Sequence, residues 1–257
     1  EKFIAKTTGK LPGKYKAHPV TAVDANGDLY AFTGNVAEFG AWLDKAVYPV
    51  VIDPDFTAQP DPTDGLDTFN YAPLPDTGFG TDNRLLTGTY SAVDYQSRAF
   101  LKFNLSSIPE GATITSATLS LYLLDGRTVS NKTHTIHRVT NDWAEDQLTW
   151  NNRLTGTAWN TAGGDYSATP TDSITVGAYL AWYSWNILAD VQAWYAGTYP
   201  NYGSVIVGDE SVIQTRKQFN SSDYTTDESL RPKLVIEYTA GATGVPKHFM
   251  HYKRLRG

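Results

Sequence analysis

The segment from Arg98 to Leu105 constrains the fold most tightly, because its apolar and polar side chains alternate with a period of two. One face carries Ala99, Leu101, Phe103 and Leu105. The other face carries Arg98, Lys102 and Asn104, with Phe100 as its one apolar member. A single apolar face at this period is typical of a strand that packs on a core on one side and meets water on the other. The segment therefore predicts a β-sandwich or a β-barrel.

Further short strands with turn signals between them extend this pattern. Residues 117–123 and 233–238 alternate cleanly, and extended runs are expected at 134–140, 174–176, 185–187 and 205–207. Leu188, Val191 and Tyr195 are spaced for a two-turn helix that Gly197 ends. We therefore predict an all-β, antiparallel sandwich with one short helix.

The segment before this sandwich predicts a small β-hairpin. Asn26-Gly27 lies between two extended runs in residues 17–36, and both residues tolerate positive φ. A short helix is expected at 36–43. Residues 57–77, rich in Pro, Asp and Thr, predict a long surface loop. We place an N-terminal extension at 1–51, the sandwich at 52–239 and a basic tail at 240–257.

Several sequence blocks resemble a known family. DNRL at 82–85 is followed by RAFLKFNLSSIPEGATITSATLSLY at 98–122, and further blocks lie at 137–153, 185–194, 201–207 and 231–238. Together they closely resemble the DNRLRE-domain family over residues 52–239. The resemblance implies a non-catalytic jelly-roll module similar to carbohydrate-binding modules. Such modules occur on secreted polysaccharide-degrading enzymes, on cell-surface proteins and on phage-encoded structural proteins, and some bind acidic polysaccharide.

The resemblance also bears on metal binding, because jelly-roll modules often hold a structural Ca²⁺. The oxygen-rich stretch from Asp61 to Asp67 is where we expect such an ion. No spacing of ligands identifies the site. No other cofactor is expected.

Charge is distributed unevenly along the chain. Of the 21 bases and 27 acids, nine bases and Glu1 lie at the two ends, which leaves 12 bases, 26 acids and a net charge of −14 in residues 17–246. An acidic body repels polyanions, so nucleic acid is not an expected partner and an acidic polysaccharide is a poor one. The basic ends either keep the termini soluble or dock onto neighbouring copies or other assembly subunits. The expected assembly contacts are Lys2, Lys6, Lys10, Lys14, Lys247, Phe249, Tyr252, Lys253, Arg254 and Arg256.

The residues that the sequence lacks exclude several kinds of functional site and make membrane insertion unexpected. The chain has no Cys, which excludes disulfides, thiolate metal sites and Cys nucleophiles. No apolar run is long enough to span a bilayer, so membrane insertion is not expected. No signal peptide is visible, and the start at Glu1 indicates a processed product, a fragment or a chain whose true start is unseen.

The sequence offers no catalytic constellation. It lacks a Gly-x-Ser-x-Gly string, and His134 and His137 fall on opposite faces of an expected strand. The many acids show no spacing typical of a glycosidase pair, and a solvated acidic surface explains them. Arg84, Arg98 and Arg153 are expected to cross-link loops through bidentate hydrogen bonds with neighbours such as Asp76, Asp82 or Asn152, and a ligand role is the second interpretation. We therefore predict that the chain is not an enzyme.

Aromatic side chains near turns are the candidates for glycan binding, because sugar rings stack on Trp and Tyr. The candidates are Trp159, Tyr166, Trp182, Tyr183, Tyr199 and Tyr202. Packing of loops explains the same residues equally well. Trp143, Trp150 and Trp194 are expected in the core.

Two functions remain open. The first is a structural or adhesion protein of an extracellular assembly, with a component of a phage virion surface as the favoured case. The second is a glycan-binding module from a larger secreted or cell-surface protein, with a cell-surface polysaccharide as its partner. Both place the chain outside the cell or on a virion surface.

Overall fold

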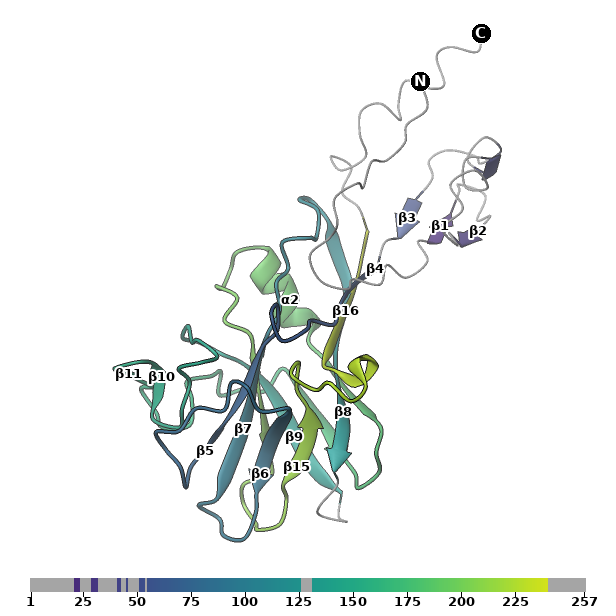
Figure 1. Cartoon of the computed structure of the whole chain (residues 1–257). Coiled ribbons are helices and arrows are strands. Elements are labelled where there is room, and N and C mark those ends of the chain that lie inside the picture. The colour runs from purple at the N-terminus through teal and green to yellow at the C-terminus, as the bar shows by residue number, and fades with distance from the viewer. Residues whose placement is uncertain are drawn as a thin grey trace.

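The computed structural model describes residues 21–23, 29–31, 41–42, 45, 51–53, 55–125 and 131–239. Strands dominate this part of the chain, and α2 (Leu188–Tyr195) packs beside them (Figure 1). The predicted all-β class with one short helix is therefore confirmed. Within the described ranges, no helix has the length and apolar character needed to cross a bilayer.

Most strands form two antiparallel layers. The first layer runs in the order β12 (Asp172–Val176), β9 (Lys132–Arg138), β14 (Ser204–Gly208), β7 (Gln96–Lys102) and β5 (Leu66–Tyr71). The second layer contains β13 (Trp182–Asn186), β8 (Thr113–Asp125), β16 (Lys233–Thr239) and β4 (Asp55–Ala58). Two strands, β6 (Arg84–Thr89) and β15 (Lys217–Asn220), join the layers, because β6 pairs with β7 and β15 pairs with both β6 and β8.

The main core lies between the two layers and follows the alternation of the sequence. Leu119, Leu121 and Leu123 point inward from β8 and are at most 1% exposed. They belong to the same buried cluster as Ala99 and Leu101 of β7. Each fully buried Leu stabilises the fold by roughly 1.5–3 kcal/mol through removal of apolar surface from water. The strands predicted from period two therefore face the core as expected.

The outer face of the first layer carries a second hydrophobic cluster. Phe100 and Val205 point outward from β7 and β14 and are fully buried. They are covered by residues 139–171, here called the covering loop, which supplies Trp143, Leu148 and Trp159. The loop contains β10 (Asn152–Leu154) and β11 (Thr157–Ala158). We call this side of the sandwich the covered face.

The prediction of a surface loop over residues 57–77 is wrong in its central part. This stretch contains the end of β4 and the whole of β5, and residues 67–70 of β5 are all buried. Polar composition misled the prediction, because buried Asp67 and Asn70 are stabilised by hydrogen bonds to distant segments. A polar side chain with such partners is compatible with a buried strand.

The N-terminal segment forms a small separate sheet in the order β2 (Leu29–Ala31), β1 (Thr21–Val23) and β3 (Val51–Asp53). Antiparallel pairing of Val23 with Leu29 agrees with the predicted hairpin. The helix predicted at 36–43 lies mostly outside the described residues. All ten expected assembly contacts at the two ends also lie outside them.

Candidate functional site

The outer face of the second layer, here called the bare face, carries an aromatic and cationic cluster. Trp182 lies opposite Tyr122 in the pairing of β13 with β8. Their ring centroids are 5.5 Å apart with an edge-to-face angle of 76°. The Lys233 ammonium of β16 lies 4.2 Å from the centroid of the Trp182 ring. The ammonium and the Tyr122 ring therefore hold a half-exposed indole in place by contacts that each contribute about 0.5–1.5 kcal/mol.

Hydrogen-bonding side chains lie along the same face of the sheet. Ser184 and Asn186 follow Trp182 at every second position of β13 and are exposed. The Ser184 hydroxyl lies 2.8 Å from the hydroxyl of Ser120, its partner on β8. Glu237 is exposed on β16. The period of two thus places hydroxyl, amide, carboxylate and ammonium groups on the same outward face as the indole. Ser184 and Lys233 lie nearest to Trp182 in the register, whereas Glu237 is level with Ser116, six positions along β8 from Tyr122, the partner of Trp182.

The covered face carries a hollow of about 460 Å³. It is lined by Arg98, Thr140, Asn160, Thr161, Gly164, Asp165, Tyr166 and Ala168. A wider hollow of about 680 Å³ lies beside the end of α2 and is lined in part by Trp194 and Tyr195. The Tyr195 hydroxyl there is bound to the backbone of Pro109 and Ala112, which gives it a structural role.

The six aromatic candidates for glycan binding do not form one site. Trp182 stands on the bare face, Tyr166 lines the hollow of the covered face, and Tyr199 is exposed with the Arg138 guanidinium 3.8 Å from its ring centroid. Trp159 is buried against Phe100, with ring centroids 5.6 Å apart, and so offers no surface for stacking.

The other two candidates pack toward the interior. Tyr183 packs against the main core, and its hydroxyl accepts a hydrogen bond from the Gly177 amide and donates one to the Tyr179 carbonyl. Tyr202 packs against the second hydrophobic cluster. Tyr166 packs against the same second cluster as Tyr202. Tyr166, Trp182, Tyr183 and Tyr202 are all partly exposed, and Tyr199 is exposed.

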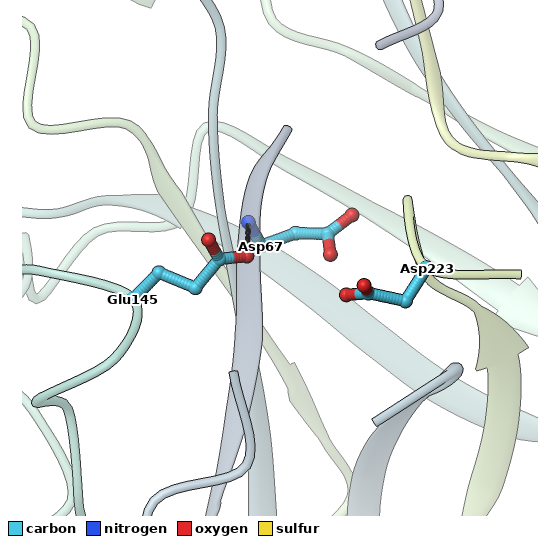
Figure 2. Close-up of side chains that lie close together, drawn as sticks. All are labelled: Asp67, Glu145 and Asp223. Carbon is cyan, nitrogen blue, oxygen red and sulfur yellow. Dashed lines mark hydrogen bonds between the residues drawn. The ribbon is translucent and has the colours of Figure 1, made fainter. Parts of the chain in front are cut away.

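Three carboxylates from distant segments meet beside the first layer (Figure 2). Asp67 begins the buried part of β5, Glu145 belongs to the covering loop, and Asp223 follows β15. One oxygen of each lies within 4.8 Å of the others. Glu145 Oε1 accepts a hydrogen bond of 3.0 Å from the Asp67 backbone amide, and the Asp67 carboxylate accepts hydrogen bonds from Ser222.

Comparison with known protein families shows which family the chain belongs to. The model of carbohydrate-binding module family 96 matches residues 63–238. The chain belongs to this family. No curated protein matches the sequence. The match supports the carbohydrate-binding-module character that the sequence resemblance implied, whereas the DNRLRE family itself and a phage origin stay predictions.

Burial shifts the pKa values of the acidic cluster of this module. Desolvation, together with the nearby charges of Glu145 and Asp223, raises the pKa of Asp67 to about 8, although hydrogen bonds from Ser222 oppose the shift. Desolvation and the charges of Asp223 and Asp146 likewise raise the pKa of Glu145 to about 7. The cluster therefore holds protons near neutral pH unless a cation neutralises its charge.

The donor set of the module fits a hard cation. Ca²⁺ takes six to eight oxygen ligands, and carboxylates are its preferred protein ligands. Asp67, Glu145 and Asp223 would hold the ion and neutralise the charge that burial disfavours. The predicted stretch from Asp61 to Asp67 contributes Asp67 alone, because the Asp61 carboxylate accepts hydrogen bonds from the amides of Thr63 and Asp64.

Of the three predicted arginine cross-links, only that of Arg98 joins distant segments through a bidentate contact. Arg84 binds Asp82 through two hydrogen bonds of 2.8 Å, a bidentate pair with an expected partner, but the two residues are only two positions apart. Arg98 makes the same bidentate contact with Glu210, which the sequence did not suggest. Arg153 donates to the Asp142 carbonyl.

Some residues of the candidate sites escaped sequence reasoning. Glu145 and Asp67 lie 78 positions apart, and no local pattern links them. Tyr122 and Lys233 carried a usable signal, because each occupies an outward position of a cleanly alternating strand. That signal gives the face of each residue but not its neighbour on the next strand.

Proposed function

We propose that this module is a non-catalytic binding protein that holds a glycan chain on its bare face. The observation that carries the proposal is the partly exposed Trp182 ring, which shares the outward face of an open sheet with hydrogen-bonding side chains. The apolar face of a pyranose ring stacks on an indole, and Ser184 and Lys233, the nearest of these side chains, would bind its hydroxyl groups. An open sheet suits an extended chain of sugars because it does not close around either end.

The charge of the module favours a neutral glycan. Residues 17–246 carry a net charge of −14, which repels a polyanion at long range. On the bare face itself, β16 carries one base, Lys233, and one acid, Glu237, four positions apart, so this strand adds no net charge to the face. We therefore propose a neutral, hydroxyl-rich polysaccharide as the partner and an extracellular location for the encounter.

Affinity electrophoresis tests this proposal. The full chain is run through gels that contain xylan, galactomannan, β-glucan or alginate. We expect saturable retardation by at least one of the three neutral polymers. Trp182→Ala should weaken that binding by roughly tenfold or more, since one stacked aromatic contributes on the order of 1–3 kcal/mol.

Tyr179→Ala is the matched control, because Tyr179 is an aromatic residue that is 82% exposed and precedes β13. Its binding should equal that of the unmodified chain. Equal binding by Trp182→Ala would contradict the role of the bare face. Stronger retardation by alginate than by every neutral polymer would contradict the proposed ligand class.

Participation in a larger assembly remains a second proposal, which the basic and apolar residues of both ends support at the level of sequence. A glycan-binding module can also act as an adhesion protein on a virion or cell surface. Analytical ultracentrifugation of the full chain and of a chain without residues 245–257 tests this. Assembly that survives the deletion unchanged would contradict the role of the tail.

A further inference from the structure

The hollow on the covered face is built by two glycines in conformations that other residues rarely adopt. Gly163 and Gly164 have φ values of +90° and +119°. A Cβ at Gly163 would lie 2.5 Å from Arg98 Nη1, and one at Gly164 would lie 2.7 Å from the Phe100 ring. The covering loop therefore reaches this depth because both positions lack a side chain.

Asp165 fixes the loop around the hollow. Its carboxylate accepts hydrogen bonds of 2.9 Å from the amides of Asn160 and Thr161 and one of 2.8 Å from the Asn141 side chain. Its carbonyl accepts a hydrogen bond from the Thr140 amide. These bonds hold the rim of the hollow in one shape before any ligand arrives, which lowers the entropy lost on binding.

The charged groups of the hollow are already matched. Arg98 makes two hydrogen bonds of 2.8 Å with Glu210, and its guanidinium lies 4.9 Å from the centroid of the Trp150 ring. The Asp165 carboxylate is occupied by its three donors. An ionic ligand would have to displace one of these contacts, so the hollow favours an uncharged ligand.

The rim also offers polar groups that are available to a ligand. The side chains of Thr140, Asn160 and Thr161 are exposed and make no hydrogen bond with the described residues. The half-buried Tyr166 ring forms one wall, and its hydroxyl makes no hydrogen bond within the same part of the chain. Hydroxyl and amide groups beside one aromatic ring match the surface of a neutral sugar.

We propose that this hollow binds a single pyranose residue, at the end or on a branch of a neutral glycan. Its volume of about 460 Å³ lies low in the range of small-molecule sites, roughly 300–1,000 Å³, and is too small for an extended chain. The ligand class rests on the proposed function, but the site is separate from the bare face. The module then contacts one glycan along its length and another at a terminus, from opposite sides of the sandwich.

Titration of the isotope-labelled full chain with methyl glycosides of glucose, galactose, mannose and xylose tests the proposal by NMR. We expect at least one of them to shift the amide signals of Asn160, Thr161 and Gly164 in a saturable way. The double substitution Asn160→Ala with Thr161→Ala should weaken this binding about tenfold, because it removes two hydrogen-bonding groups. It leaves the backbone contacts with Asp165 in place, so the fold is retained.

Thr155→Ala is the matched control, since Thr155 is an exposed hydroxyl residue of the same loop that uses its amide alone in a hydrogen bond. It should leave the titration unchanged, as should Trp182→Ala. The proposal is overturned if none of the four glycosides shifts the rim amides at about 50 mM, a concentration that detects even millimolar affinity. It is also overturned if the double variant titrates like the unmodified chain.

The two proposals fail in different ways. If polymers retard the chain in a way that depends on Trp182 but no glycoside shifts the rim amides, the proposal for the hollow is contradicted and that for the bare face stands. If the rim amides shift but Trp182→Ala binds polymers as well as the unmodified chain does, the proposal for the bare face is contradicted and that for the hollow stands.

Discussion

The two outer faces of the sandwich differ although both layers share one core. On the covered face, the outward residues Phe100 and Val205 are fully buried beneath the covering loop. On the bare face, the outward residues Ser184 and Asn186 are exposed, and Trp182 is partly exposed. Outward apolar residues occur on both faces, Phe100 and Val205 on one and Trp182 and Val235 on the other, so their presence alone does not tell which face another segment covers.

This difference also separates two kinds of aromatic side chain. Trp159 and Trp182 both lie near turns in the sequence, yet one packs on Phe100 and the other projects from an open sheet. Burial of a whole indole removes a large apolar area from water and contributes to folding. A half-exposed indole contributes less to folding and keeps surface for a sugar.

The largest expected effect tests the covered face. Phe100→Ala should lower the free energy of unfolding by about 3–5 kcal/mol, because it leaves a cavity between β7, Trp143 and Trp159. Urea unfolding followed by Trp fluorescence measures the change. A loss below about 1 kcal/mol would mean that the covering loop does not pack as the structure describes.

Binding of Ca²⁺ to the acidic cluster should stabilise the covering loop on the covered face, because this loop supplies Glu145 to the cluster. At a hundred times its dissociation constant, the ion should raise the free energy of unfolding by about 2.7 kcal/mol. That gain corresponds to a rise in melting temperature of roughly 5–10 °C for a domain of this size. Proteolysis of residues 139–171 should slow in parallel.

Asp67→Asn should abolish this response, whereas Asp64→Asn should not, because Asp64 is exposed and lies outside the cluster. Calorimetric melting with Ca²⁺ and with EDTA gives the comparison. An equal response of both variants would exclude the cluster as the Ca²⁺ site.

The free energy of unfolding of the metal-free protein should depend on pH because of the same cluster. Because burial raises the pKa of Asp67 from 3.8 to about 8, the native state binds a proton that the unfolded state releases. The resulting stabilisation is complete below about pH 4 and is lost as the pH rises to about 8. Urea unfolding in EDTA at several pH values measures the slope, and Asp67→Asn should flatten it.

The smallest expected effect compares one substitution on the two faces. Val205→Ala on the covered face should cost about 1–2 kcal/mol, because Val205 is fully buried and its strand neighbours cannot fill the space. Val235→Ala on the bare face should cost about 0.5 kcal/mol or less, since Val235 is partly exposed. Equal costs would show that the bare face is covered by another part of the full chain.

Sequence reasoning recovered the elements with a regular period. The inward faces of β7, β8 and β16 and the helix that ends before Gly197 were predicted from spacing alone. The strand β5 was missed because its buried polar residues depend on partners elsewhere, such as Gly163 for Asn70. Of the candidate aromatics, Trp182 and Tyr166 lie at the two proposed glycan sites, whereas Trp159 is buried and follows the alternative of loop packing that the sequence left open.

The sequence by itself determined which side of each strand enters the core, because side chains alternate with a period of two and water disfavours the apolar set. The tertiary structure alone decided which outer face is covered and which acids meet. Those outcomes depend on contacts between distant positions, such as Asp67 with Ser222 at a separation of 155 residues. Periodicity is a local property, and the placement of a loop over a sheet is fixed by the free energy of long-range packing.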